Sequence, residues 1–165
     1  MKISKTSVFS WVIVIWISKV FLFSLPYKFT LHPDTQHIFG VIGEWLKGIV
    51  GETGGALFTN YGSYVVGGVE LITAIILLAP ALFFIFKKLG VINNSPNIYL
   101  MHTIGGALAS MVMSGAVFFH LFTPLGIEVI HEGKNDGGSL FFAAVSILVL
   151  GAMMAFFNLI KFKKD

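Results

Sequence analysis

The chain has 165 residues, of which 56% are hydrophobic and only 12% are charged, so its composition excludes an ordinary water-soluble domain. Its eleven basic residues are all lysines that gather at the edges of apolar segments, so the net charge of +3 indicates membrane orientation and does not favour nucleic-acid binding. The chain has no cysteine, which excludes disulfide exchange, iron–sulfur clusters and cysteine-ligated zinc from its own chemistry.

Four apolar stretches are long enough to cross a bilayer, for which a helix needs roughly 20 residues. They cover about residues 7–26, 62–86, 98–122 and 139–160. Because they account for nearly the whole chain, the sequence predicts one all-α domain over residues 1–165, built as a four-helix transmembrane bundle.

The first stretch starts after a basic segment and contains Lys19. A secretory signal peptide has a shorter apolar region and ends at small residues. This stretch is longer and leads instead to Pro26, Tyr27 and Lys28. We therefore interpret it as a transmembrane helix.

The connection between the first two spans has about 35 residues, too many for a simple turn. Pro33 suits the first position of a helix. Apolar side chains then recur at helical spacing: Ile38, Val41, Ile42, Trp45, Leu46 and Ile49. The pattern predicts an amphipathic helix over residues 33–50 that packs on the outer ends of the bundle, and the segment from Gly51 to Gly55 is expected to break it.

The second span contains a single charge, Glu70, inside the apolar run from Val65 to Phe86. A carboxylate in hydrocarbon is costly unless it is paired, protonated or facing a polar cavity, so it indicates a functional site. Small and polar side chains share its helical face, opposite Val, Ile and Leu: Ser63, Gly67, Thr73 and Ala74. We therefore expect Glu70 to point into the bundle.

The third span carries His102 and, near its end, His120. A separation of 18 residues places them about 27 Å apart along one helix, so they cannot bind the same ion. A metal or haem site in which His120 joins other histidines, at 32, 37 or 131, has no recognised ligand spacing, so the sequence does not favour haem or a metal.

Small residues recur every four positions in the last two spans and predict close helix contacts there. They are Gly106, Ser110 and Ser114 in the third span, with Gly151 and Ala155 in the fourth. Before the fourth span, Asp136 is followed by two glycines, which predict a turn.

Counting inward from the span ends, Lys19 and Glu70 each lie about 12 Å below the outer boundary and His120 about 6 Å below it. A cluster of these three side chains is therefore allowed. One interpretation is a structural ion pair between Lys19 and Glu70 that fixes the helix register. The other is a carboxylate that accepts protons or anchors a ligand.

Lysines mark one side of the membrane. They precede the first span, follow the second at Lys87 and Lys88, and follow the fourth. The positive-inside rule then places both termini and the loop after residue 88 in the cytoplasm. The other two connections then face outward, which would be the periplasm in a Gram-negative cell.

Several segments together resemble the DoxX family of small four-helix bacterial inner-membrane proteins. They are FLFSLPYKFT at 21–30, HIFG at 37–40, GVELI at 68–72, SGAVFFHL at 114–121, LGI at 125–127 and NDGG at 135–138. The resemblance implies that Lys28, Glu70, His120 and Asp136 occupy the polar positions of that family, whereas Lys19 is not part of the resemblance.

Some members of that family are membrane subunits of thiosulfate:quinone oxidoreductase or of stress-related oxidoreductase assemblies. The resemblance implies a small accessory subunit with an outward-facing polar pocket for quinone and with other membrane subunits as partners. No nucleophile triad or phosphate loop is present, so the sequence does not favour an enzyme acting alone. Two alternatives stay open: a proton-coupled solute carrier or binding protein that uses Glu70 and His120, and a structural accessory subunit of a larger membrane complex.

Overall fold

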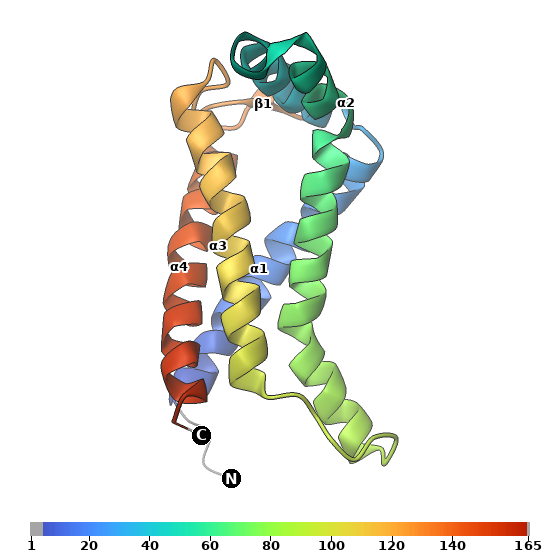
Figure 1. Cartoon of the computed structure of the whole chain (residues 1–165), viewed down its shortest axis with the longest axis vertical. Helices are drawn as coiled ribbons and strands as arrows, with labels where there is room; N and C mark the ends of the chain where they lie inside the picture. The colour runs from blue at the N-terminus through green and yellow to red at the C-terminus, as the bar shows by residue number, and fades with distance from the viewer. Residues whose placement is uncertain (1–4, 165) are drawn as a thin grey trace.

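The computed structural model describes residues 5–164 as four long helices and one short hairpin (Figure 1). The elements are α1 (Lys5–Phe29), α2 (Pro33–Lys88), α3 (Ile98–Phe122), β1 (Ile130–His131), β2 (Lys134–Asn135) and α4 (Ser139–Phe162). All four helices are long and apolar enough to cross a membrane. The predicted all-α, four-helix architecture is confirmed, and the hairpin is an element that the sequence did not predict.

A break at Gly51 divides α2 into two legs. Its backbone has φ 81° and ψ 168°, a conformation that glycine adopts far more readily than other residues. The predicted helix over 33–50 is therefore present and begins at Pro33 as expected. The break itself is shorter than predicted, because residues 52–55 are already helical.

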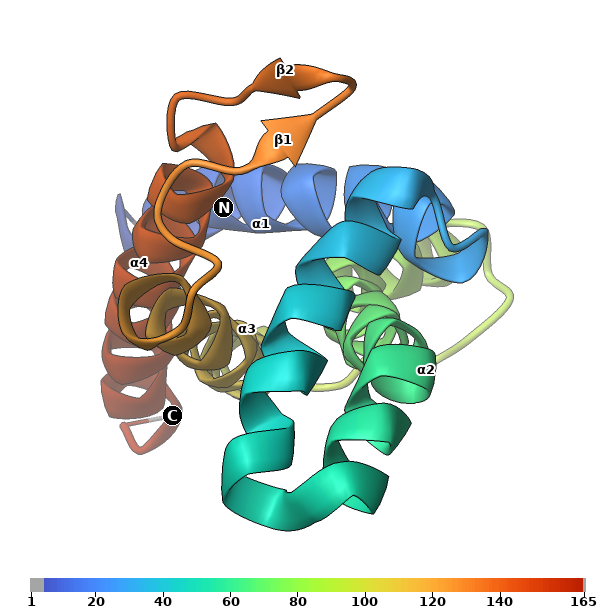
Figure 2. The ribbon, with the colours of Figure 1, turned by 90° about the horizontal axis from the view of Figure 1, so that it is seen from above.

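The first leg and the start of the second lie side by side and cover one end of the bundle, as Figure 2 shows from above. A side chain at Gly55 would place its Cβ 2.5 Å from the carbonyl oxygen of Gly43, so the legs approach through glycine. Ile42 packs below them with Leu125 and Val129. We call residues 33–60 the roof, the end that it covers the capped end, and the opposite end, where α1 begins and α4 ends, the terminal end.

The roof helix buries most of the predicted apolar face, including Ile42 at 4% exposure. Ile49 is the exception at 62% exposure, so its predicted place on the packed face is wrong. It lies two residues before the break at Gly51, at the end of the first leg.

Helix α1 slants across the bundle (Figure 1). Near the terminal end it contacts α4, where Asn158 Nδ2 donates to Ser10 Oγ over 2.9 Å. Near the capped end it contacts α2, since Cβ at Gly67 would lie 3.4 Å from Cβ of Lys28. The separation between α1 and α4 therefore grows toward the capped end.

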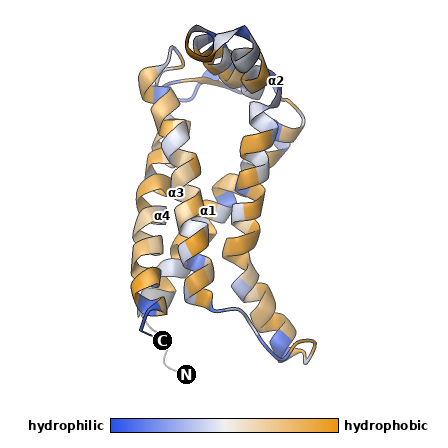
Figure 3. Ribbon diagram, viewed as in Figure 1, coloured by the Kyte–Doolittle hydropathy of each residue, from blue (hydrophilic) through white to orange (hydrophobic). Residues whose placement is uncertain are grey.

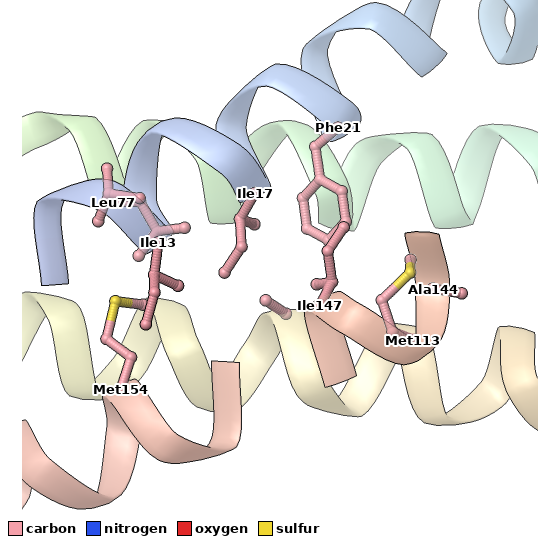
Figure 4. Packing of buried hydrophobic residues seen from close by; sticks show 10 residues of the cluster. Ile13, Ile17, Phe21, Leu77, Met113, Ala144, Ile147 and Met154 are labelled. Carbon is pink, nitrogen blue, oxygen red and sulfur yellow. The ribbon is translucent and has the colours of Figure 1, made fainter. Parts of the chain in front are cut away.

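The apolar core joins all four helices (Figure 4). Ile17 and Phe21 of α1, Leu77 of α2 and Ile147 of α4 are all fully buried. The outward faces of the helices are also largely apolar, whereas hydrophilic residues gather near the helix ends (Figure 3). Helices that are apolar on their inward and their outward faces are typical of a lipid environment.

The predicted small-residue contacts between α3 and α4 are confirmed at Gly106 and Gly151. A Cβ at Gly106 would lie 2.6 Å from the carbonyl oxygen of Gly151. Ser110 Oγ donates to the carbonyl oxygen of Leu148 over 2.9 Å. Ser114 is exposed and bonds within its own helix, so it does not belong to this interface.

Candidate functional site

A cavity of about 610 Å³ lies in the capped half of the bundle. All four helices and the loop between α3 and α4 contribute to its wall, and the roof helix closes its upper side. Four of the five predicted site residues line it: Lys19, Lys28, Glu70 and His120. Asp136, the fifth, does not.

The centre of this site is an ion pair between Lys28 and Glu70. Lys28 Nζ lies 2.7 Å from Glu70 Oε2, and the two side chains are 15% and 4% exposed. Ser24, one helical turn before Lys28, lies with its Oγ 2.7 Å from the same Glu70 oxygen and 2.9 Å from Lys28 Nζ. The three groups therefore form one connected polar cluster in a largely apolar wall.

The predicted inward orientation of Glu70 is confirmed by the burial of its whole helical face. Ser63, Thr73 and Ala74 are each 0% exposed. Within residues 5–164, the hydrogen bonds to this carboxylate all go to Oε2. The second oxygen, Oε1, is therefore available to a ligand in the cavity.

The pairing considered for Lys19 and Glu70 is not formed. Lys19 is exposed and makes no ion pair among the residues that the structure describes. Counting depth from the span ends assumes upright helices, whereas α1 slants across the bundle and approaches α2 at Lys28. Side chains of helical residues lean toward the N-terminus of their helix, so Lys28 reaches back from the capped end to Glu70.

His120 is 7% exposed and lies on the cavity wall. Its Nδ1 lies 2.6 Å from the carbonyl oxygen of Gly126, and a carbonyl only accepts, so Nδ1 carries a hydrogen. The ring also packs edge-on against Phe141, at 5.7 Å between centroids. Nε2 makes no hydrogen bond to any described residue and is therefore the nitrogen available for a ligand or a proton.

Asp136 organises the loop that precedes α4. Its carboxylate accepts hydrogen bonds from the backbone N–H groups of Val129, Gly138 and Leu140, each over 2.9 Å. Burial raises the pKa of Asp136, but these backbone donors, helped by the Ser139 hydroxyl, more than offset it and lower the pKa below the ordinary value. Asp136 thus supports the wall through Leu140, which lines the cavity, without touching the cavity itself.

A second set of polar contacts lies at the cavity edge, and the sequence did not predict it. Asp34 Oδ2 lies 3.0 Å from His131 Nδ1 and accepts from the Glu132 backbone N–H over 2.9 Å. Tyr27 Oη donates to Glu132 Oε1 over 2.8 Å. These contacts tie the hairpin to the roof and to α1. Sequence reasoning placed these residues on the outer side but had no signal for the hairpin that brings them together.

The histidines do not assemble into a metal site. Across residues 5–164, no three His, Cys, Asp or Glu side chains gather closely enough to hold a metal ion. His102 lies far from the cavity residues, 1% exposed and edge-on to Trp11 at 5.1 Å between ring centroids. The alternative of a metal or haem centre at His120 gains no support from this geometry.

Comparisons with protein-family models, with curated proteins and with solved structures gave no match. The site itself combines a largely apolar cavity with a buried carboxylate, a half-buried lysine and a histidine whose Nε2 is available. Such an arrangement suits an amphiphilic ligand that exchanges hydrogen bonds or protons at its polar end.

Proposed function

We propose that this protein is a small membrane subunit of a respiratory or stress-related oxidoreductase and that its cavity binds a quinone. The observation that carries the proposal is the cluster of Ser24, Lys28 and Glu70 on the wall of a largely apolar cavity. The DoxX resemblance supports the oxidoreductase part, because Lys28, Glu70 and His120 fall in the resembling segments and line this same cavity.

The cavity suits the shape and polarity of a quinone. Its volume of about 610 Å³ lies inside the range of roughly 300–1,000 Å³ that small-molecule sites occupy. Aromatic side chains from α1, α2 and α3 contribute to the wall: Trp16, Phe39, Phe58 and Phe119. Flat rings pack well against such surfaces, and the few polar groups then fix the ligand's orientation.

The polar groups match the chemistry of a quinone head group. The Lys28 ammonium donates to a quinone carbonyl, and Oε1 of Glu70 accepts from the hydroxyl of the reduced form. Reduction of a quinone takes up two electrons and two protons. Glu70 and His120 hold or deliver the protons, and a redox-active partner subunit supplies the electrons.

The proposal includes an orientation. We place the capped end on the extracytoplasmic face of a bacterial inner membrane. Lysines at the terminal end support this choice, because Lys87 and Lys88 close α2 there and Lys161 lies in the last turn of α4. The quinone site then opens toward the outer leaflet.

The carrier alternative needs a route from the cavity to the terminal end. Directly beyond the cavity, Ile13, Ile17 and Leu77 pack at 0–2% exposure and leave the site one-sided. This packing favours a binding site over a transport pathway. A purely structural subunit predicts instead that the polar cluster is dispensable once folding is matched.

Quinone binding is tested by quenching of tryptophan fluorescence, since Trp16 lines the cavity. The purified protein in lipid nanodiscs is titrated with a decyl benzoquinone and, as a matched probe, with decylbenzene. We expect saturable quenching by the quinone alone. Glu70→Gln should weaken it by about tenfold, whereas Glu52→Gln, an exposed control with a side chain 86% accessible, should not change it.

The subunit role is tested in native membranes. The chain is purified with its partners in mild detergent, and quinone-reductase activity is measured with and without it. Co-purification of a flavin- or haem-containing oxidoreductase whose quinone turnover falls when this chain is removed supports the proposal. Unchanged turnover after its removal contradicts the subunit role, and equal quenching by both probes contradicts the quinone site.

A further inference from the structure

The exposed part of the cavity wall lies on two helices only. The wall residues with exposed side chains are Trp16, Lys19 and Phe23 of α1 and Ser139 and Leu140 of α4. Every wall residue on α2 and α3 is buried or half-buried. The cavity therefore opens sideways between α1 and α4, and we call this opening the portal.

The portal has a defined frame. Trp16 Nε1 donates to Ser146 Oγ over 3.0 Å, and among residues 5–164 this is the last hydrogen bond between α1 and α4 before the capped end. At the capped end, the bond from Tyr27 to Glu132 closes the frame. Tyr27 comes eleven positions after Trp16 in α1, which gives the portal a height of about 16 Å at ~1.5 Å per residue.

An apolar groove continues from the portal toward the terminal end, on the outside of the bundle. Its volume is about 410 Å³, and it is lined by Phe9, Val12, Ile13, Trp16, Ser146 and Leu150. Trp16 belongs to the walls of both the cavity and this groove. A molecule that fills the cavity and leaves through the portal thus meets a continuous apolar track between α1 and α4.

Lys19 supplies a charge at the portal. It lies midway between Trp16 and Phe23 on α1, exposed and without an ion pair among the described residues. An unpaired ammonium within the apolar band of a membrane is costly. Such a group therefore faces a polar partner or water. A ligand with an acceptor oxygen at the portal provides that partner.

We infer that the ligand is a long-tailed membrane quinone that enters from the bilayer through the portal between α1 and α4. This inference rests on the proposed function and adds the route and the class of quinone. The head group reaches the cluster of Lys28 and Glu70, Lys19 donates to an oxygen of the head group at the portal, and the tail lies in the groove beside Val12 and Leu150.

The tail position is tested by photo-cross-linking in nanodiscs with quinones that carry an azide at the end of the tail. The inference expects labelled peptides from the portal and groove, around Val12, Phe23 or Leu150. Labelling around Val66 and Phe119, on the α2 and α3 side of the cavity, overturns it. Competition by unlabelled quinone confirms that the label reports the bound state.

The portal is also tested by narrowing it. Ala143 lies on the α4 side of the cavity wall, whereas Ala152 is exposed farther along the same helix and lines neither cavity nor groove. Ala143→Phe should weaken the binding of a long-tailed quinone by about tenfold, while a tail-less benzoquinone binds nearly as before. Ala152→Phe should change the binding of neither ligand. Equal losses for both ligands, or no loss, contradict entry through the portal.

Lys19 is tested separately with Lys19→Gln. Loss of its charged hydrogen bond should weaken quinone binding by about tenfold, and Lys134→Gln, an exposed control in β2, should leave binding unchanged. Saturable quinone binding that is unchanged by Lys19→Gln and Ala143→Phe contradicts entry through the portal but still supports the quinone site. If the unaltered protein shows no saturable quinone binding, the proposed function is contradicted as well.

Discussion

The two halves of the bundle accommodate polar groups within apolar surroundings in different ways. In the terminal half, α3 and α4 meet through Gly106 and Gly151, and the hydrogen bond from Asn158 to Ser10 joins two buried side chains. In the capped half, α1 has moved away from α4, a cavity of about 610 Å³ separates the helices, and a buried ion pair lies on its wall. Close packing defines one half, and a polar cluster defines the other.

This difference separates the residues that hold the fold from those available for function. Side chains such as Ile17 and Leu77 are fully buried and have no surface left for a ligand. Lys28 and Glu70 contact each other but also line a cavity that a ligand can enter. Substitutions should therefore affect stability through packing in one half and through charge pairing in the other.

The largest effect is expected from Lys28→Met. Removing the lysine leaves the Glu70 carboxylate, 4% exposed, with Ser24 as its remaining hydrogen-bonding partner. Breaking a buried ion pair on one side costs about 3 kcal/mol or more of unfolding free energy. Unfolding in mixed micelles with increasing denaturing detergent measures the loss.

The double variant Lys28→Met with Glu70→Gln is the control for that experiment. It removes both charges, so most of the lost stability should return if the penalty comes from an unpaired carboxylate. Losses that simply add in the double variant would show that the two charges do not stabilise each other.

A matched pair of glycines on α3 compares the two halves directly. A Cβ at Gly106 would press on the carbonyl oxygen of Gly151, whereas Cβ at Gly115, on the cavity wall, would meet nothing within 4 Å. Gly106→Ala should therefore lose about 1–3 kcal/mol through overpacking. Gly115→Ala should gain up to about 1 kcal/mol, because alanine is the better helix former.

Unfolding of both glycine variants in mixed micelles compares the packing of the two halves. Similar losses for Gly106→Ala and Gly115→Ala would mean that the capped half is packed as tightly as the terminal half. A gain at Gly115 alone confirms that the cavity wall has room, and quinone quenching measured on the same sample reports whether the added methyl group reaches the ligand.

Local patterns in the sequence were sufficient for the helices and for one side of the site. The apolar lengths fix the spans, and the small residues around Glu70 fix the face that it shares. Pro33 marks the start of the roof helix for a local reason too, its backbone suiting a first helical position. These features depend on residues close together in the chain.

The remaining features depend on how distant elements meet. The partner of Glu70 is Lys28 because α1 slants, and no local pattern within α1 encodes that slant. The hairpin joins Ile130 with Asn135 by a single short ladder that leaves no periodic signal. Asp136 was assigned to the site by resemblance, whereas its backbone partners show a role in ordering the loop.

Asp136→Asn should have an intermediate effect, because this loop supports the wall of the open half. The carboxylate accepts three backbone hydrogen bonds, and loss of a helix-capping group costs about 1 kcal/mol. Its pKa is lower in the folded protein, so the unfolded chain binds more protons in acid. The stabilisation is therefore complete above the ordinary value of 3.8 and is lost as the pH falls through the lower folded value.

Unfolding of the unaltered protein and of Asp136→Asn from pH 6 to about pH 2 measures this contribution. The difference in stability between the two proteins should be constant at the upper end of the range and shrink below the ordinary value of 3.8. A difference that persists unchanged in acid would mean that Asp136 stabilises the loop independently of its charge.

The smallest effect is expected from Glu44→Gln on the roof, although its ion pair has the same length as the one in the cavity. Lys47 Nζ lies 2.7 Å from Glu44 Oε2, and Lys28 Nζ lies 2.7 Å from Glu70 Oε2. The surroundings differ, since the Glu44 side chain is 72% exposed and that of Glu70 only 4%. Water and salt screen the exposed pair, so Glu44→Gln should leave the unfolding midpoint unchanged. A clear destabilisation by Glu44→Gln would show that distance, and not burial, governs the strength of these pairs, and would remove the basis for treating the cavity pair as special.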